Sequence, residues 1–374
     1  MSIVKHLPKV ATRKQFMDQL SSMIAPPKSE VSEAQDLRGH PTWFKSYLIE
    51  SNAPLKDSYQ FDHTTVQLDN TGVDDLKILT MRQGVERGRM VEAQFYVDIV
   101  NKRFPVLHTN YRAVETHNFV ESLIGSQNNF DSAWLSTNLL KKLAVQPGNR
   151  GYGFRVDYED IFHVSDEGED DITPQEDFTI DTTGSISDKA LTLLRTDKDV
   201  ERTMGYEKIT IGRGTKRRGV LEDLRFNGRA SVVKGRSIDD HVVLVDTVRR
   251  EYANQVKVVE DESIYANVQQ RTLEGRAFDF EFNRGVENWD LYLDRIFNAK
   301  EPFHVWGMKS KAGDGFDRVL AVDMHTGHPF DVEVTNHLFR VYLPRGSCGN
   351  AVLRLFVNLQ RYFDSMIRCS ALAG

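Results

Sequence analysis

The sequence predicts an α+β protein made of two mixed α/β units. Three observations support this fold class. The chain has 374 residues, which is longer than the roughly 250–300 residues that one hydrophobic core holds. Hydrophobic residues make up 40% of it, which is enough for folded domains. Segments in which apolar residues alternate are interspersed with segments in which they recur at helical spacing.

The first 58 residues are predicted to form a polar N-terminal arm with short helices. Phe16, Leu20 and Ile24 recur every four residues, which is typical of one face of a helix. The prolines at 26 and 27 end that helix, since proline disfavours helical geometry in the residue before it. A second apolar cluster, from Trp43 to Leu48, also has helical spacing.

Residues 59–156 are predicted to form the first α+β domain. Alternating apolar residues indicate strands near residues 61–68, 76–79 and 95–99. Residues 114–124 and 133–143 have the apolar stripe of amphipathic helices.

Residues 157–184 are predicted to be an acidic linker or exposed loop. The stretch from Asp157 to Asp181 holds eleven acidic residues and no lysine or arginine. Such a run repels itself and forms cores poorly. The whole chain has a formal charge of −6, so the chain outside this run is net basic.

Residues 185–374 are predicted to form the second α+β domain. A helix begins at Ser187, and strands follow near residues 208–211, 219–226 and 230–233. The segment from Val242 to Val259 fits either a helix or a buried strand followed by a helix, and its periodicity leaves both open.

The last hundred residues predict an antiparallel-rich sheet packed against a long C-terminal amphipathic helix. A helix is expected over residues 289–297, and the turn at 325–328 indicates a β-hairpin. From Asn350 onward, apolar residues form one wide helical stripe. The expected strands cover residues 277–282, 303–307, 319–324, 330–335 and 338–343.

Composition excludes several classes of protein. The chain contains no run of 18 apolar residues and no apolar segment typical of a secretory signal near its start. We therefore expect no membrane association. Cys348 and Cys369 are the two cysteines, too few for a disulfide scaffold or a thiolate zinc site. This composition favours synthesis in the cytoplasm.

The predicted hairpin carries a candidate metal or catalytic site. Five potential ligands fall within eleven residues, and in a strand residues i and i+2 share a face. Carboxylate and imidazole groups of this kind can hold a divalent metal that activates water. Asp323 and Glu333 would then be the catalytic carboxylates of a hydrolase or nuclease. The alternative is an exposed polar turn. The five residues are Asp323, His325, His328, Asp331 and Glu333.

A basic, glycine-flanked segment is a candidate phosphate or nucleic-acid contact. Arg213, Lys216, Arg217 and Arg218 lie within six residues, where their side chains can contact phosphates without reading sequence. The alternative is a solvated hairpin tip, or a partner for the acidic run of the same chain.

A Ser-x-Glu step at Ser165, Asp166 and Glu167 lies in the acidic segment. This step, the polar N-terminal arm and the compact second half are similar to head and inner-body precursor proteins of giant tailed phages. The resemblance implies proteolytic processing at this step and a structural role in a virion, close to packaged DNA.

These observations together favour a non-enzymatic structural or assembly protein without a cofactor. Its expected partners are proteins or further copies of itself, with non-specific nucleic-acid contact through the basic segment. A metal-dependent hydrolase or nuclease centred on the hairpin is the alternative, and a divalent metal would be its cofactor.

Overall fold

The computed structural model describes residues 6–24, 44–61, 63–85, 89–111, 113–159, 178–184, 186–215, 219–283, 285–286, 289–313 and 316–372. The chain divides into two compact units, each assembled from three separate stretches. Unit 1 comprises residues 1–133, 147–150 and 211–249, and unit 2 comprises 134–146, 151–210 and 250–374. The chain therefore passes between the units several times, whereas the sequence predicted two consecutive domains separated by a linker over residues 157–184.

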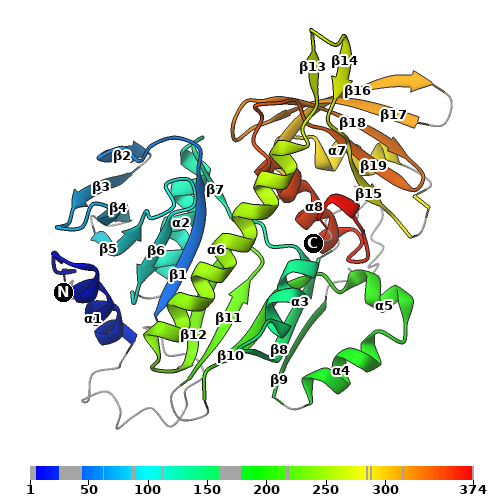
Figure 1. Cartoon of the computed structure of the whole chain (residues 1–374). Helices are drawn as coiled ribbons and strands as arrows, with labels where there is room; N and C mark the ends of the chain where they lie inside the picture. Colours follow the sequence, from blue (N-terminus) through cyan, green and yellow to red (C-terminus); the bar gives the residue numbers. More distant parts are fainter. Residues whose placement is uncertain are drawn as a thin grey trace. The chain divides into compact units, whose positions relative to one another are not determined.

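Unit 1 contains an antiparallel sheet and helices α1 (Arg13–Ile24) and α2 (Ala113–Ser126). Neighbouring strands in this sheet run in the order β2-β3-β4-β5-β6-β1-β12-β11, and β7 also pairs with β1 (Figure 1). The strands are β1 (Lys45–Ser51), β2 (Ser58–Phe61), β3 (Thr64–Asn70), β4 (Leu76–Val85), β5 (Arg89–Asp98), β6 (Val106–Thr109), β7 (Phe130–Ser132), β11 (Val220–Arg225) and β12 (Arg229–Gly235).

Alternation along these strands divides the core of unit 1 in two. In β4, Ile78 lies in a cluster with Phe16 of α1, whereas the next residue, Leu79, lies in a cluster with Phe119 of α2. Successive side chains of a strand point to opposite faces, so α1 and α2 cover opposite faces of the sheet. The helix predicted from Phe16, Leu20 and Ile24 is confirmed as α1, and all three residues are buried.

Within the predicted apolar cluster, residues 45–48 belong to strand β1, not to the predicted helix. All seven residues of β1 are buried, and β6 and β12 pair with its two edges. Its polar residues have partners inside the fold: Lys45 Nζ donates to the Tyr111 carbonyl at 2.5 Å, and Arg103 pairs with Glu50 at 2.7 Å. The segment predicted to be an arm is therefore a central strand.

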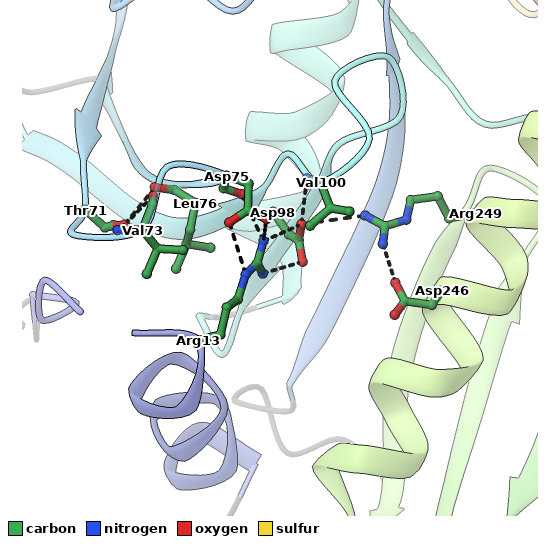
Figure 2. Close-up of polar contacts among 9 residues, drawn as sticks. All are labelled: Arg13, Thr71, Val73, Asp75, Leu76, Asp98, Val100, Asp246 and Arg249. Atoms are coloured by element: carbon green, nitrogen blue, oxygen red, sulfur yellow. Dashed lines mark hydrogen bonds and ion pairs between the residues drawn. The ribbon is translucent and has the colours of Figure 1, made fainter. Parts of the chain in front are cut away.

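Figure 2 shows how the N-terminal end of α1 is attached to the sheet. Arg13 reaches two carboxylates, at 2.6 Å from Asp75 and 2.9 Å from Asp98. Asp98 also lies 3.6 Å from Arg249, which in turn pairs with Asp246 at 2.6 Å. This network joins the helix, the end of β5 and helix α6 (Ile238–Asp261). The segment 242–259, which sequence left open, is thus helical.

Unit 2 combines a five-stranded antiparallel sheet, a small hairpin and several helices. In the five-stranded sheet the order is β15-β19-β18-β17-β16, while β13 pairs with β14 and β8 with β9. The strands that lie wholly or mostly in unit 2 are β8 (Asn149–Tyr158), β9 (Phe178–Thr183), β10 (Tyr206–Arg213), β13 (Tyr265–Asn267), β14 (Thr272–Glu274), β15 (Phe278–Glu281), β16 (Val305–Gly313), β17 (Phe316–Asp323), β18 (Pro329–Thr335) and β19 (Leu338–Tyr342). The helices are α3 (Thr137–Val145), α4 (Ser187–Leu194), α5 (Lys198–Thr203), α7 (Trp289–Ile296), α8 (Asn350–Tyr362) and the short η3 (Ser370–Leu372).

The C-terminal part confirms the predicted α+β arrangement. β17 and β18 form the expected hairpin, with Val319 opposite Val332. Helix α8 packs on the sheet, and the ring of Phe356 lies 5.1 Å from that of Phe280. The helix is buried along nearly its whole length, including Arg354 and Asn358. The end of the predicted acidic linker differs from expectation, because residues 178–183 form β9, which pairs with β8.

Candidate functional site

Helix α3 presents two polar side chains to a pocket in unit 2. Ser136 caps the helix, since its hydroxyl accepts from the Leu139 backbone N–H at 3.1 Å. Leu139, Leu140 and Leu143 are buried. Asn138 and Lys141, three residues apart, therefore share the other face of the helix and line the pocket.

The start of α3 is fixed by two segments distant in sequence. The Thr137 backbone N–H donates to Gln360 Oε1 at 3.1 Å, and the Tyr206 N–H donates to the Thr137 hydroxyl at 3.5 Å. Gln360 in turn donates to the Ile367 carbonyl at 3.2 Å. These bonds hold Lys141, Tyr206 and the stretch after α8 around one cavity, and a site held by rigid elements is well positioned.

The cavity has a volume of about 360 Å³, within the range typical of small-molecule sites. Three cationic residues line it, Lys141, Arg195 and Arg368, together with Tyr206. We call these four residues and the cavity that they line the cationic pocket. The remaining lining residues are Asn138, Glu201, Met204, Glu281, Ser365, Met366, Ile367, Cys369 and Ser370.

Lys141 is a cation of the pocket whose pKa is lowered. Burial, reinforced by the positive charge of Arg195, lowers the pKa of its ammonium group to about 8. Its Nζ lies 5.1 Å from the centre of the Tyr206 ring, close enough for a cation–π contact. Among the described residues, no carboxylate forms an ion pair with Lys141. A bound anion would thus form the first ion pair of Lys141 within the described residues.

Two acidic residues of the lining offset part of its positive charge. Glu201 forms ion pairs with Lys198 at 2.6 Å and with Arg195 at 3.9 Å. Glu281 is exposed, and its backbone pairs with that of Arg368. Burial raises the pKa of the Cys369 thiol to about 11, so this cysteine is protonated at neutral pH and is a poor nucleophile.

Unit 1 holds a different cluster, a buried chain of four polar side chains. Glu222 Oε2 lies 2.7 Å from His241 Nδ1, and His241 Nε2 lies 2.6 Å from Ser46 Oγ. On the other side, Ser46 Oγ lies 2.7 Å from His108 Nδ1. We call Glu222, His241, Ser46 and His108 the buried polar chain. They come from four elements, β11, α6, β1 and β6.

The order of these groups is that of a carboxylate–histidine–serine triad, but its hydroxyl is closed to substrates. Ser46 is only 1% exposed and His241 is 0% exposed. The ring of Phe44 lies 4.9 Å from that of His241. Burial, helped by His241, lowers the pKa of His108 to about 3. In this structure the buried polar chain provides hydrogen-bond partners for polar groups inside the core.

The side chains predicted to form a metal or catalytic site on the hairpin contact different partners. Asp323 is buried and forms an ion pair with Arg354 of α8. It also accepts from the Thr326 hydroxyl at 2.7 Å and from the His325 backbone at 3.2 Å. Burial raises its pKa, but Arg354 and these hydrogen bonds outweigh that effect, so the pKa lies below its ordinary value. Asp323 therefore closes the hairpin turn and ties it to α8.

The other candidate ligands of the hairpin do not converge on Asp323. Asp331 pairs with Arg318 across the sheet, and Glu333 accepts from the Tyr342 hydroxyl at 2.5 Å. His325 is buried, whereas His328 is exposed. Within the described ranges, no group of three or more His, Cys, Asp or Glu side chains is arranged to hold a metal ion.

Two further candidate sites fall largely outside the described residues. Lys216, Arg217 and Arg218 of the basic segment lie there, and so do Ser165, Asp166 and Glu167 of the predicted processing step. Arg213 is described: its guanidinium donates to Asn149 Oδ1 at 2.7 Å and lies 3.9 Å from Asp240. This arginine is therefore engaged within unit 1.

The fold and its sites define an α+β protein of two units, each assembled from separate stretches of the chain, with a cationic pocket in one unit and a buried polar chain in the other. A family model described as MJECL33-like protein matches residues 4–372. The chain belongs to this family. It is 25% identical over 398 residues to the protein of Methanocaldococcus jannaschii named "Uncharacterized protein MJECL33", covering 96% of this chain and 94% of that relative. No solved structure matches.

The family match overturns the resemblance to head and inner-body precursor proteins of giant tailed phages. The match extends over almost the whole chain, and the relative is archaeal. The resemblance depended on a three-residue step and on overall organisation, which recur by chance in unrelated proteins. The virion role and the processing step were implied by this resemblance and lose that basis.

Among the described residues, no helix combines the length and the apolar character needed to cross a membrane.

Proposed function

We propose that this protein binds a small organic anion in the cationic pocket of unit 2. One observation carries the proposal: Lys141, Arg195 and Arg368 converge on a cavity of about 360 Å³. Charge-assisted hydrogen bonds from such groups to an anion are stronger than neutral ones. Partial burial of Lys141 also reduces the screening of its charge by water.

The lining also favours an organic anion over a bare inorganic one. Met204, Met366 and Ile367 supply apolar surface, and Tyr206 supplies an aromatic face. Ligand sites typically combine such apolar walls with a few polar groups that fix orientation. The proposed ligand therefore carries an anionic group and a short carbon skeleton.

Isothermal titration calorimetry with a panel of small carboxylates and organic phosphates tests this function. We expect Lys141→Met and Arg195→Gln each to weaken binding by about tenfold, since each removes one charge-assisted contact of roughly 1.5 kcal/mol. Lys142→Met is the matched control, because Lys142 lies on the same helix and pairs with Glu251 at 3.3 Å. Absence of binding, or equal weakening by the control, contradicts the proposal.

Contact with nucleic acid through the basic segment is a separate proposal. It predicts that affinity for duplex DNA falls steeply as salt increases, and less steeply after Lys216, Arg217 and Arg218 are replaced by alanine. A salt titration followed by fluorescence anisotropy measures both slopes, and equal slopes exclude this contact.

A further inference from the structure

We propose that Lys141 is a nucleophilic amine that forms an imine with a small carbonyl compound carrying a carboxylate, such as a 2-oxo acid. The inference rests on the proposed function and deepens it, since it assigns the class of ligand and a covalent step to the same pocket.

The geometry provides what imine formation requires. Lys141 extends from a capped helix into a cavity large enough for a short oxo acid. Its amine is not held by a carboxylate of the described residues, and an ion-paired ammonium would be a poorer nucleophile. Arg195 and Arg368 line the same cavity and can pair with the carboxylate of the ligand. That pairing would bring the carbonyl group, one bond away in a 2-oxo acid, toward Nζ.

The electrostatics favour the reactive form of the amine. Burial and the neighbouring Arg195 lower the pKa of Lys141 to about 8. A desolvated lysine beside another cation is a recognised way to obtain a neutral, nucleophilic amine near neutral pH. The neutral fraction at pH 7.4 is then on the order of a hundredfold larger than for a lysine with the ordinary pKa of about 10.4.

The covalent step is balanced without an additional reactant. Nζ forms a bond to the carbonyl carbon while the π electron pair moves to the oxygen, which receives one amine proton. The resulting carbinolamine loses its hydroxyl group together with the second amine proton as water, and a carbon–nitrogen double bond forms. The net reaction joins an amine and a carbonyl compound, releases one water molecule and involves no oxidation or reduction.

Reductive trapping tests the inference on the full-length protein. The protein is incubated with pyruvate and sodium cyanoborohydride, which reduces an imine to a stable secondary amine, and peptide mass mapping then locates the adduct. We expect roughly tenfold more adduct at Lys141 than at Lys142. The larger neutral fraction of Lys141 should outweigh the lower intrinsic nucleophilicity of a less basic amine. Labelling should rise with pH around a midpoint near 8. Adducts spread evenly over surface lysines would overturn the inference.

Two variants and two further ligands separate this inference from anion binding alone. Lys141→Arg keeps the positive charge but cannot form the imine, whereas Lys142→Arg alters the ion-paired neighbour. We expect trapping to disappear only in Lys141→Arg. Lactate has the carboxylate of pyruvate but lacks its ketone group, so it should compete with pyruvate for the pocket without being trapped. Acetone, which lacks the carboxylate, should be trapped at least tenfold less. If calorimetry detects binding of lactate but pyruvate is not trapped, the imine fails and anion binding stands. If neither occurs, both fail.

Discussion

The buried polar chain of unit 1 and the cationic pocket of unit 2 both contain titratable groups with shifted pKa values, but their surroundings differ. In the buried polar chain, each group is hydrogen-bonded to the next, and Ser46 is 1% exposed. In the pocket, Lys141 faces a cavity and pairs with no carboxylate of the described residues. A shifted pKa accompanies both structural networks and functional sites. Access for a ligand, and not the pKa alone, distinguishes the two.

The largest effect is expected from breaking the buried polar chain. His241→Ala leaves the Glu222 carboxylate and the Ser46 hydroxyl without the partner that lies between them. Leaving buried hydrogen-bonding groups without a partner typically destabilises a protein by about 1–3 kcal/mol for each group. We expect a decrease of this size in the free energy of unfolding, measured by urea denaturation. A decrease below about 1 kcal/mol would show that the chain contributes little to stability.

A second test uses the pH dependence of stability. The pKa of His108 falls from 6.5 to about 3 on folding, so the unfolded state binds more protons between these pH values. The resulting stability is fully present above about pH 6.5 and is lost progressively as the pH falls toward 3, by up to about 1.4 kcal/mol per pH unit.

His108→Gln removes this contribution and should flatten the pH profile of urea denaturation between pH 6 and 4. His117 is the natural comparison, because burial also lowers its pKa, to about 4, while it lies outside the buried polar chain. An unchanged slope in His108→Gln would contradict the assigned role of His108.

The smallest effect is expected at the attachment of α1. Arg13 and Asp75 are 36% and 43% exposed, so water and salt screen their attraction. We expect Arg13→Ala to lower the free energy of unfolding by about 1 kcal/mol or less, and the difference from the unmodified protein to shrink at 1 M NaCl. A loss that is independent of salt would indicate a role in packing instead of charge, such as the contact of Arg13 with the Phe16 ring.

Most of the secondary structure could be predicted because it follows from local periodicity. Helix α1, the hairpin of β17 and β18 and helix α8 lie where their patterns indicated. Strand β1 was mistaken for a helix because it is buried on both faces and contains Lys45, Ser46 and Glu50. A strand in that environment has no simple alternation, and the partners that neutralise its polar groups are far away in sequence.

The candidate sites could be predicted less well, because they depend on contacts between distant segments. The five hairpin residues are close in sequence, yet Asp323 forms an ion pair with Arg354, which lies 31 positions later. Lys141, Arg195, Tyr206 and Arg368 come together only in the folded unit. The one local signal of the pocket was the polar pair Asn138 and Lys141 on the face of α3 opposite its leucines.

The position of β1 also has a consequence for synthesis of the protein on the ribosome. One edge of β1 pairs with β12, whose first residue, Arg229, is translated long after Ser51. At about 5–20 residues per second, that edge stays unpaired on the order of ten seconds or more. An open strand edge invites pairing with other chains. The nascent chain is therefore most vulnerable to aggregation before β12 emerges, and chaperones that bind extended segments would protect it in that interval.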